Sequence, residues 1–406
     1  MERTILHCDM NNFFASVECL KFPHLRDVPM AVCGDVEERH GVVLAKNEKA
    51  KAFGVSTGET VWNAKQKCPE LVTVPPHHGE YAEFSKRAFE IYSRFTDEIE
   101  PFGMDECWLD VTGSLRLFGS GEEIADKIRA IVKEELGLTA SVGVSFNKVF
   151  AKLGSDMKKP DATTIISKEN FKERVWGLPA TEMLGVGKAT AKKLNSYGIY
   201  TIGHIAARPR EYFENLLGKV GVQIWRSACG LDDSPVVYHT PDELDKSCGH
   251  GTTTRHDLTS PEEVWKLILE LSQQIGHKLY KHNKKATGVS ISIRDNRLIT
   301  KQWQCRLKTP SASPSVIAKA AFSLFERSYL WAHPIRSVTV TAIDLVDKDT
   351  PQQLEMFCDA ESDARAEALD RTIEEIRSKY GKNSIKNAVL IDGRGTKKNE
   401  SNDKTR

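Results

Sequence analysis

The segment that most constrains the fold is an apolar run that ends in an acidic residue and then turns. Residues 4–18 read TILHCDMNNFFASVE, with a β-type run at 5–8 that ends at Asp9. A turn at 10–12 leads into a predicted helix at 13–20. A carboxylate at the end of a buried strand can face a metal ion rigidly. The alternative is that Asp9 only caps the helix.

A second acidic site lies in residues 99–113, IEPFGMDECWLDVTG, where Asp105 and Glu106 come at the turn of a predicted hairpin. Adjacent strand side chains point to opposite faces, so both carboxylates reach one ion only if the backbone bends, as Gly103 permits. Buried carboxylates without a cation are costly. A hard divalent ion, which prefers oxygen ligands, would hold Asp9, Asp105 and Glu106 together. Two such ions are the usual apparatus for in-line attack at phosphorus.

These two segments resemble the catalytic motifs of the Y-family (translesion) DNA polymerases of the bacterial polymerase IV type, and the resemblance covers about residues 1–347. It implies an α+β right-hand fold with a ferredoxin-like palm, small fingers, a helical helix-hairpin-helix thumb and an α+β little finger. It also implies that Asp9, Asp105 and Glu106, helped by the Met10 carbonyl, hold two Mg²⁺ ions.

The resemblance divides the chain into five parts and a linker. The expected boundaries are palm 1–12 and 75–167, fingers 13–74, thumb 168–236, linker 237–246, little finger 247–347, and tail 348–406.

Composition is consistent with this division without proving it. The chain has 57 basic and 56 acidic residues, so its bulk charge does not indicate nucleic acid. Residues 247–347 carry fourteen Lys/Arg against eight Asp/Glu, which suits a phosphate-facing module. The alternative is a solvated basic face. Nine scattered cysteines predict reduced core residues, and with no signal peptide or membrane-spanning run we expect a cytoplasmic protein.

The predicted fingers depart from the family pattern at three positions. A Tyr and an Arg normally contact the triphosphate there, after a Ser or Thr. This chain has Glu48, Lys51 and Ala45 instead. Lys51 keeps the charge but loses the bidentate fork of arginine, or it is simply a solvent-facing helix charge. Glu48 would repel a triphosphate unless it is turned away or paired with a lysine.

Three further residues are assigned to the substrate by resemblance. Phe13 and Phe14 would contact the incoming nucleotide, with Phe14 as a steric gate beneath the sugar, although Phe14 could instead be core. Lys159, in Lys158-Lys159-Pro160, would bind the triphosphate, since an ammonium is a suitable counter-charge for leaving pyrophosphate.

Two segments are candidates for DNA contact. Residues 183–206 resemble a helix-hairpin-helix, in which Gly185, Gly187 and Lys188 would approach a phosphate. The alternative is an ordinary helical hairpin. On the predicted little-finger strands, four basic residues are candidates for phosphate contact: Arg294, Arg297, Lys301 and Arg306.

The tail carries a short peptide similar to the sliding-clamp-binding motif of bacterial polymerases. Its candidate residues are Gln353, Leu354, Met356 and Phe357. An extended peptide of this kind fills a partner's groove with its apolar anchors. The alternative is that these side chains fold back on the little finger. A helix is predicted at 361–380, before a polar end.

The resemblance therefore implies a monomeric, low-fidelity polymerase that binds primer-template DNA, deoxynucleoside triphosphates and a sliding clamp. No segment is left over for a proofreading exonuclease. One rival is a catalytically silent relative that binds DNA and the clamp as a repair scaffold. That rival needs the acidic ligands to be lost, and only Glu48 and Ala45 favour it. A nucleotide cyclase with a similar palm is a more distant alternative.

Overall fold

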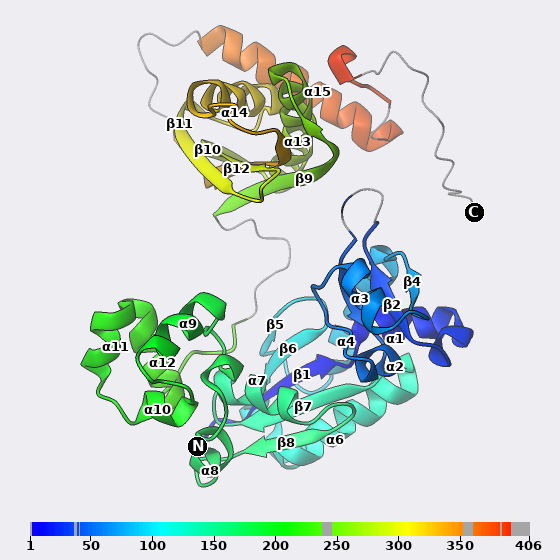
Figure 1. Cartoon of the computed structure of the whole chain (residues 1–406), viewed down its shortest axis with the longest axis vertical. Helices are drawn as coiled ribbons and strands as arrows, with labels where there is room; N and C mark the ends of the chain where they lie inside the picture. The colour runs from blue at the N-terminus through cyan, green and yellow to red at the C-terminus, as the bar shows by residue number, and fades with distance from the viewer. Residues whose placement is uncertain are drawn as a thin grey trace. The chain divides into compact units, whose positions relative to one another are not determined.

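The computed structural model describes residues 2–35, 39, 41–237, 246–351, 360–381 and 384–390 (Figure 1). Its contacts divide the chain into two units, Met1–Val36 with Gly41–His239, and Glu37–His40 with Thr240–Arg406. This division separates the predicted little finger and tail from the rest of the chain. The finer domain boundaries stay predictions.

The first unit is built around a five-stranded sheet, which we call the central sheet. Its strand order is β5-β6-β1-β7-β8, with β1 antiparallel to both neighbours and β7 parallel to β8. The strands are β1 Ile5–Met10, β5 Ile99–Pro101, β6 Glu106–Asp110, β7 Ala140–Ser145 and β8 Thr163–Ile166. Every residue of β1 is buried, because helices cover both faces of the sheet at this strand.

Helices α4 (His78–Tyr92) and α6 (Gly121–Ile131) share one core with the central sheet. Helix α7 (Lys148–Met157) packs against β1 and β7 on the other face. The contact with β7 is unusually close. A Cβ on Gly143 would lie 1.9 Å from the carbonyl oxygen of Ala151 in α7. Glycine at this position therefore lets α7 lie directly on the sheet.

A small three-stranded sheet of order β3-β2-β4 adjoins α1 (Phe13–Lys21). Its elements are β2 Met30–Cys33, β3 Val43–Lys46, β4 Val72–Val74, α2 Glu48–Ala52 and α3 Val61–Lys67. Asn47 caps α2 by accepting from Ala50 N at 2.9 Å, and the same side-chain oxygen accepts from Met30 N at 3.1 Å. The cap thus ties α2 to β2, and Gly54 follows the helix with a φ of 79°.

The end of the first unit is helical and has its own core. Its elements are α8 Phe171–Val175, η4 Ala180–Glu182, α9 Lys188–Ser196, α10 Ile202–Ala206, α11 Arg210–Leu217 and α12 Lys219–Ala228. The helical run expected just before Gly185 is only the single 3₁₀ turn η4, because Met183 is already extended.

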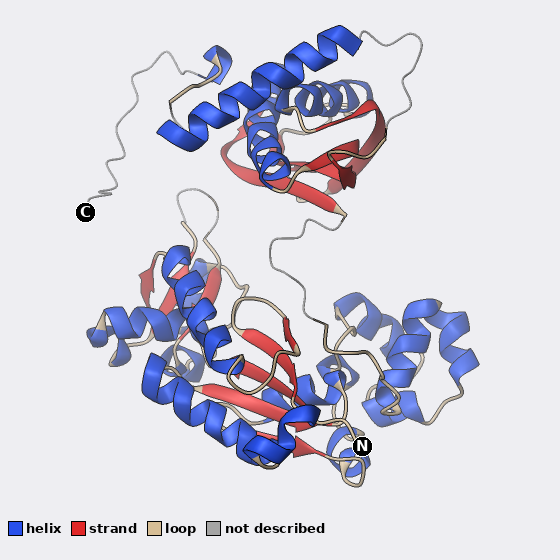
Figure 2. Ribbon diagram, turned by 180° about the vertical axis from the view of Figure 1, so that it is seen from behind, coloured by secondary structure: helices blue, strands red, loops and turns tan. Residues whose placement is uncertain are grey.

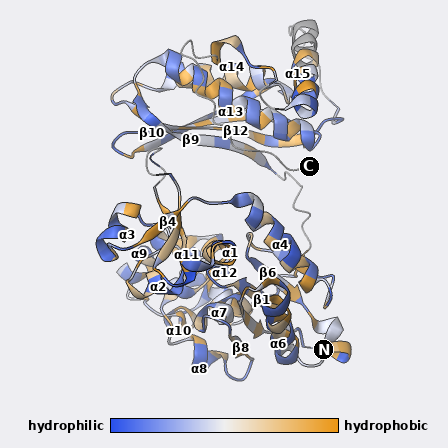
Figure 3. Cartoon of the chain, turned by 90° about the vertical axis from the view of Figure 1, so that its right-hand side faces the viewer, coloured by the Kyte–Doolittle hydropathy of each residue, from blue (hydrophilic) through white to orange (hydrophobic). Residues whose placement is uncertain are grey.

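The elements of the second unit follow the order β-α-β-β-α-β before the tail. Its sheet, which we call the C-terminal sheet, is antiparallel with strand order β11-β10-β12-β9. The elements are β9 Ser247–Leu258, α13 Pro261–Lys281, β10 Lys284–Asp295, β11 Thr300–Ser311, α14 Pro314–Ser328 and β12 Ile335–Asp347. Figure 2 shows α13 and α14 together on one face of this sheet, and Figure 3 shows hydrophobic and hydrophilic positions along both helices.

The predicted tail helix is present as α15, Ala360–Tyr380, followed by the short turn η5, Ala388–Leu390. Both structural units mix helices and sheets, which confirms the α+β class. Among the described residues, eight cysteines are free thiols, as the scattered spacing predicts. No helix within the described ranges is long and apolar enough to cross a membrane.

Candidate active site

Strand alternation decides which β1 side chains face the candidate site. Leu6, Cys8 and Met10 belong to the core shared with α4 and α6, so His7 and Asp9 face α7. Glu106 is the direct antiparallel partner of Asp9. Directly opposed residues lie on the same face of a sheet, and both carboxylates therefore lie beneath α7.

The turn before β6 supplies the third carboxylate. Asp105 lies in this turn, and its backbone carbonyl accepts a hydrogen bond from Met10 N at 3.0 Å. Gly103 has a φ of 104°, so the predicted backbone bend is confirmed. Glu106 is the first residue of the strand rather than part of the turn. The structure thus brings together the three acidic residues that the sequence predicted.

Two lysines neutralise this acidic group. Lys152 Nζ lies 2.8 Å from Glu106 Oε2 and 3.5 Å from Asp9 Oδ2. Lys159 Nζ lies 2.7 Å from Asp9 Oδ2. Asp156 accepts from both ammonium groups, at 3.1 Å from Lys152 and 3.0 Å from Lys159. The predicted triphosphate lysine therefore lies at the carboxylates, while Lys152 and Asp156, one turn apart on α7, were missed.

His7 is a further buried residue that the sequence analysis missed. Its Nδ1 lies 2.8 Å from Ser155 Oγ in α7, and its Nε2 lies 3.3 Å from Glu106 Oε2. Burial lowers the pKa of His7, and the neighbouring Glu106 carboxylate offsets only part of that effect. His7 thus fixes Glu106 from the strand side while Lys152 holds it from the helix side.

The carboxylates of Asp105 and Glu106 have pKa values shifted in opposite directions. Burial, followed by repulsion from the charges of Asp9 and Glu106, raises the pKa of Asp105 to about 6. Burial would also raise the pKa of Glu106, but hydrogen bonds from His7 and Lys152 lower it to about 2. Glu106 is therefore ionised at neutral pH, and Asp105 is the acid that lacks a sufficient counter-charge.

The donor chemistry fits a hard divalent cation. The three side chains offer only carboxylate oxygens, which Mg²⁺ prefers, and a cation would relieve the repulsion that raises the pKa of Asp105. Within the described ranges, no three His, Cys, Asp or Glu side chains surround a common point as a preformed metal site. Lys152 and Lys159 contact Glu106 and Asp9 and compensate part of their charge.

Asn11 has a structural role at the end of β1. Its side chain donates to Ser141 Oγ at 3.0 Å and accepts from Asp161 N at 2.8 Å. It is 4% exposed, and it links β1 to β7 and to the loop that carries Lys159. Both polar ends of the Asn11 side chain are therefore engaged in contacts within the protein.

The three departures in the predicted fingers receive a partial explanation. Glu48 Oε1 accepts a hydrogen bond from Asn12 Nδ2 at 2.7 Å and lies 3.7 Å from Lys51 Nζ. Glu48 is thus paired with a lysine, which is the arrangement that would limit its repulsion of a triphosphate. Ala45 lies in β3 opposite Val32, and nothing in the structure explains the loss of a hydroxyl there.

The two adjacent phenylalanines occupy different environments. Phe13 is 3% exposed in the core of the first unit, and its predicted contact with the nucleotide stays a prediction. Phe14 is half-buried and stacks on Tyr81, with ring centroids 4.1 Å apart. Phe14 remains the steric-gate candidate, and the Tyr81 ring packs against it.

The predicted hairpin glycines lie at the start of α9. Gly185 has a φ of 89°, and Gly187 is the residue before Lys188, the first residue of the helix. A Cβ on Gly187 would meet no atom within 4 Å, and its φ is an ordinary −75°. No internal contact requires glycine there, which is consistent with close approach of an external group to the backbone.

The basic candidates of the C-terminal sheet divide between its faces. Ile293, buried against the helices, is the partner of Lys301, whereas Gly288 is the partner of Arg306. Alternation therefore places Arg294 and Arg306 on the face without helices, and Lys301 on the helix-covered side. Arg297 lies in the turn, 3.8 Å from Asp295. The four candidates therefore do not share one face of the sheet, and their contacts with phosphate stay predictions.

On the uncovered face of the C-terminal sheet, a Cβ on Gly251 would come 2.2 Å from Thr339 Oγ1, so glycine fits beside Thr339 without a shift of the neighbouring strand. The clamp-like peptide, Gln353, Leu354, Met356 and Phe357, lies outside the described residues.

The chain matches known proteins over most of its length. Residues 8–156 match the model of the impB/mucB/samB family, and residues 245–356 match that family's C-terminal domain. A protein of Acetivibrio thermocellus named DNA polymerase IV is 49% identical over 395 residues, covering 97% of this chain and 99% of the relative. DNA polymerase IV 1 of Bacillus subtilis is 37% identical and covers 99% of this chain and 95% of that protein.

A solved structure has the same fold. It is a Y-family DNA polymerase chimera that superposes with a TM-score of 0.75 at 25% sequence identity, covering 85% of this chain and 99% of that one. The covered 85% of this chain includes residues of both units.

Proposed function

The chain belongs to the Y-family DNA polymerases, the impB/mucB/samB family, and is a DNA-directed DNA polymerase; we propose that it performs low-fidelity translesion synthesis without proofreading. In this proposal it adds deoxynucleotides to a primer 3′ end on a DNA template. The observation that carries the proposal is the acidic group of the buried Asp9 and the partly buried Asp105 and Glu106, with Lys152 and Lys159 in contact.

Members of this family use divalent metal ions, and the residues that would hold two Mg²⁺ here are Asp9, Asp105 and Glu106 with the Met10 carbonyl. When bound, the ions would lower the pKa of the primer 3′-hydroxyl and compensate the charge of the triphosphate. The protein's own task is to hold the acids at fixed positions. Cross-strand pairing fixes Asp9 and Glu106, and the hydrogen bond from Met10 N to the Asp105 carbonyl fixes the turn that carries Asp105.

Lys159 is proposed to meet the triphosphate. Its ammonium is 2.7 Å from Asp9 Oδ2, and contacts with Asp9 and Asp156 raise its pKa despite burial. It is therefore fully protonated at neutral pH and can stabilise the charge that develops on pyrophosphate. Lys51 is proposed as a second counter-charge, with Glu48 held by Asn12 beside it.

Binding of primer-template DNA is proposed for two regions. The backbone at Gly185 and Gly187, with Lys188, would contact a phosphate, and Arg294 and Arg306 would do so from the C-terminal sheet. The rival scaffold function is less well supported, because the metal-binding acids are present and Glu48, one of its two favourable features, is paired with Lys51.

The bacterial sliding clamp is proposed as a partner of the peptide at 353–357. Changing Leu354 and Phe357 to Ala should remove most clamp affinity, since a few anchors carry most of such an interface. Clamp-independent synthesis on a short primer should be unchanged. Retained clamp binding by the double variant would assign these side chains to the fold-back alternative. The protein is further proposed to act as a cytoplasmic monomer.

A primer-extension assay tests the proposed activity. The full chain, Mg²⁺, the four deoxynucleotides and a primer on an undamaged template or one carrying an abasic site should yield extended primer on both. With a primer that ends in a 3′ mismatch, removal of the mismatched nucleotide would shorten the primer and would contradict the absence of proofreading. Complete lack of extension by the folded protein would instead support the scaffold alternative.

A further inference from the structure

The loop between α7 and β8, residues 158–162, carries Lys159. The ammonium group of Lys159 lies in the acidic site, 2.7 Å from Asp9 Oδ2. Two residues later, Asp161 has a φ of 52°, in the left-handed region that Asp adopts more readily than most residues with a Cβ. Backbone of this kind persists where the surrounding contacts hold it, so the contacts of Asp161 indicate what holds the loop in place.

Arg129 of α6 holds the backbone of this loop with its guanidinium group. Its Nη2 donates to the backbone carbonyl of Asp161 and, at 2.8 Å, to Asp161 Oδ1. Its Nε donates to the same Oδ1 at 3.2 Å. Helix α6 packs against β7 and β8 on the face of the central sheet opposite α7. Arg129 therefore ties the loop to an element that is separate from the helix before it.

The guanidinium group of Arg129 is itself held in place. Its Nη1 donates to Asp126 Oδ1 at 2.8 Å and to Thr163 Oγ1 at 3.2 Å. Thr163 donates to the same Asp126 oxygen at 2.7 Å, and the Arg129 side chain is only 21% exposed. All three nitrogens of the planar fork are engaged, which a lysine at this position would not reproduce.

The other side of the loop is tied to the acidic site. Asp161 N donates to Asn11 Oδ1 at 2.8 Å, and Asn11 is buried. Asn11 directly follows Met10, the last residue of β1, which also carries Asp9. Asp161 thus lies between α6 and the end of β1, and the loop backbone has a fixed position relative to Asp9.

A simpler explanation is that Arg129 only forms surface ion pairs. Arg129 and Asp126 are three residues apart on α6, where such pairs are common. Lys133 pairs with Asp161 Oδ2 at 3.1 Å and is 64% exposed. A surface ion pair engages side chains only, however. The hydrogen bond from Arg129 to the Asp161 carbonyl engages the backbone two residues from Lys159, and a surface pair does not account for it.

We propose that Arg129 is a positioning residue for polymerisation, which acts through Asp161 to hold Lys159 where it meets the triphosphate. This role rests on the proposed function of Lys159. The ammonium group of a lysine lies at the end of a flexible stem, so its place depends on the loop from which the stem extends. A misplacement of about 1 Å in such a group can lower the rate by about 100-fold.

The test is a double-mutant cycle between Arg129→Gln and Lys159→Ala. Single-turnover incorporation by the full chain is measured at saturating primer-template over a range of deoxynucleotide concentrations. Lys159→Ala should lower kcat/KM about 100-fold, and Arg129→Gln should lower it about tenfold, because Asn11 still holds the loop. Both variants should divide their loss between kcat and KM in the same way. In the Lys159→Ala chain, Arg129→Gln should have no further effect, because no ammonium group is left to position.

Two conservative variants separate geometry from charge, and circular dichroism checks the fold of each. Arg129→Lys keeps the charge without the fork, so its loss should approach that of Arg129→Gln. Asp161→Asn keeps an accepting Oδ1 and tolerates the left-handed backbone, so its loss should be smaller. The reverse order, with Asp161→Asn more impaired than Arg129→Lys, would overturn the proposal because charge alone would then matter.

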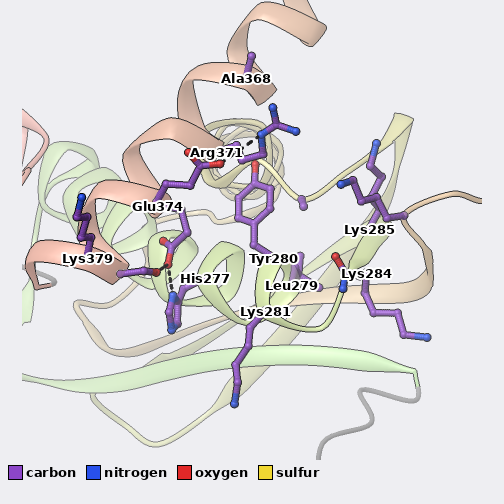
Figure 4. A pocket seen from close by; sticks show the side chains of 15 residues that line it. His277, Leu279, Tyr280, Lys281, Lys284, Lys285, Ala368, Arg371, Glu374 and Lys379 are labelled. Carbon is purple, nitrogen blue, oxygen red and sulfur yellow. Dashed lines mark hydrogen bonds and ion pairs between the residues drawn. The ribbon is translucent and has the colours of Figure 1, made fainter.

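Two controls remove charged contacts elsewhere in the chain. Arg94 makes a two-point contact with Glu135, with Nη2 2.7 Å from Oε2, and Arg94→Gln should leave kcat/KM unchanged. In the second unit, Glu374 of α15 contacts Nδ1 of His277 in α13 (Figure 4). Glu374→Gln should likewise leave kcat/KM unchanged. A tenfold loss in either control would show that the effect of Arg129→Gln is not specific.

The cycle distinguishes two failures. An unchanged kcat/KM in Lys159→Ala would refute the proposed function of Lys159 and the role of Arg129 with it. A large loss in Lys159→Ala, with Arg129→Gln either silent or equally harmful in both chains, would refute the role of Arg129 alone.

Discussion

The two sheets of this molecule differ in how they are covered, and the difference separates two kinds of charged residue. Helices cover both faces of the central sheet at β1, so Asp9 is 4% exposed and its charge must be compensated by named partners. The C-terminal sheet is covered on one face only, so Arg294 is exposed and needs no partner. Buried charged side chains with perturbed pKa values indicate a catalytic site. Exposed basic side chains instead indicate electrostatic affinity for nucleic acid.

Among substitutions that test this comparison, the largest effect is expected at Glu106. Glu106→Gln removes one charge with little change of volume, so folding should survive. Primer extension should fall by several orders of magnitude, because electrostatic stabilisation of the phosphoryl transfer is lost. Circular dichroism of the variant checks the fold. Near-normal extension by a well-folded variant would refute the catalytic assignment.

The second prediction concerns the loss of folding stability caused by the charge of Asp105. Its pKa of about 6 lies above the usual value of 3.8, so the folded state binds the proton more tightly than the unfolded state. Stability is therefore lost as the pH rises through the interval from about 4 to 6. In EDTA at pH 7, Asp105→Asn should raise the free energy of unfolding by up to about 3 kcal/mol.

Urea unfolding at pH 7 and at pH 4 measures this effect. The advantage of Asp105→Asn over the parent chain should be present at pH 7 and largely absent at pH 4, where the parent carboxyl is protonated. Added Mg²⁺ should reduce the advantage at pH 7, because a cation compensates the carboxylate. An advantage of equal size at both pH values would show that the Asp105 charge is not the cause.

The third prediction concerns Phe14 and tests whether its ring selects the sugar of the incoming nucleotide. A ring beneath the sugar would collide with a 2′-hydroxyl, so Phe14→Val should raise ribonucleotide relative to deoxynucleotide incorporation. Loss of the stacking on Tyr81 should also lower stability by roughly 1–3 kcal/mol. The matched control is Phe13→Val at the buried neighbour, which should lower stability without changing the sugar ratio. An unchanged ratio in an active Phe14→Val enzyme would make Phe14 a core residue.

The smallest expected effect is on the uncovered face of the C-terminal sheet. Arg294→Gln with Arg306→Gln should weaken primer-template affinity. It should also reduce the slope of log affinity against log salt by the amount that corresponds to about two phosphate contacts. Lys301→Gln serves as the comparison, since alternation places it on the helix-covered side. Fluorescence anisotropy at several salt concentrations measures all three proteins. An equal change in Lys301→Gln would contradict the assignment of faces.

The predictability of each site follows from the same difference in burial. Asp9, Asp105 and Glu106 could be found because acids inside apolar runs violate the strand pattern. Lys152 and His7 could not, because a helical lysine and a strand histidine are ordinary residues until β1 and α7 are packed together. That packing depends on Gly143, whose closeness to Ala151 is a tertiary property.

The C-terminal sheet shows the converse. Its strands and helices could be predicted in order, because alternation and helical periodicity are local. The face of Lys301 depends on its register with Ile293, and one residue of shift would have reversed it. The burial of Phe13 beside the half-buried Phe14 likewise depends on where α1 meets Tyr81, which no local pattern specifies.

The most direct test of the central claim is the single-turnover rate of nucleotide incorporation at saturating primer-template. It compares Glu106→Gln with the Arg294→Gln and Arg306→Gln double variant. Saturation removes differences in affinity, so the double variant should react at the parent rate while Glu106→Gln is slower by several orders of magnitude. A Glu106→Gln rate close to the parent rate, or an equally large loss in the double variant, would contradict the claim that the buried carboxylates perform the chemistry.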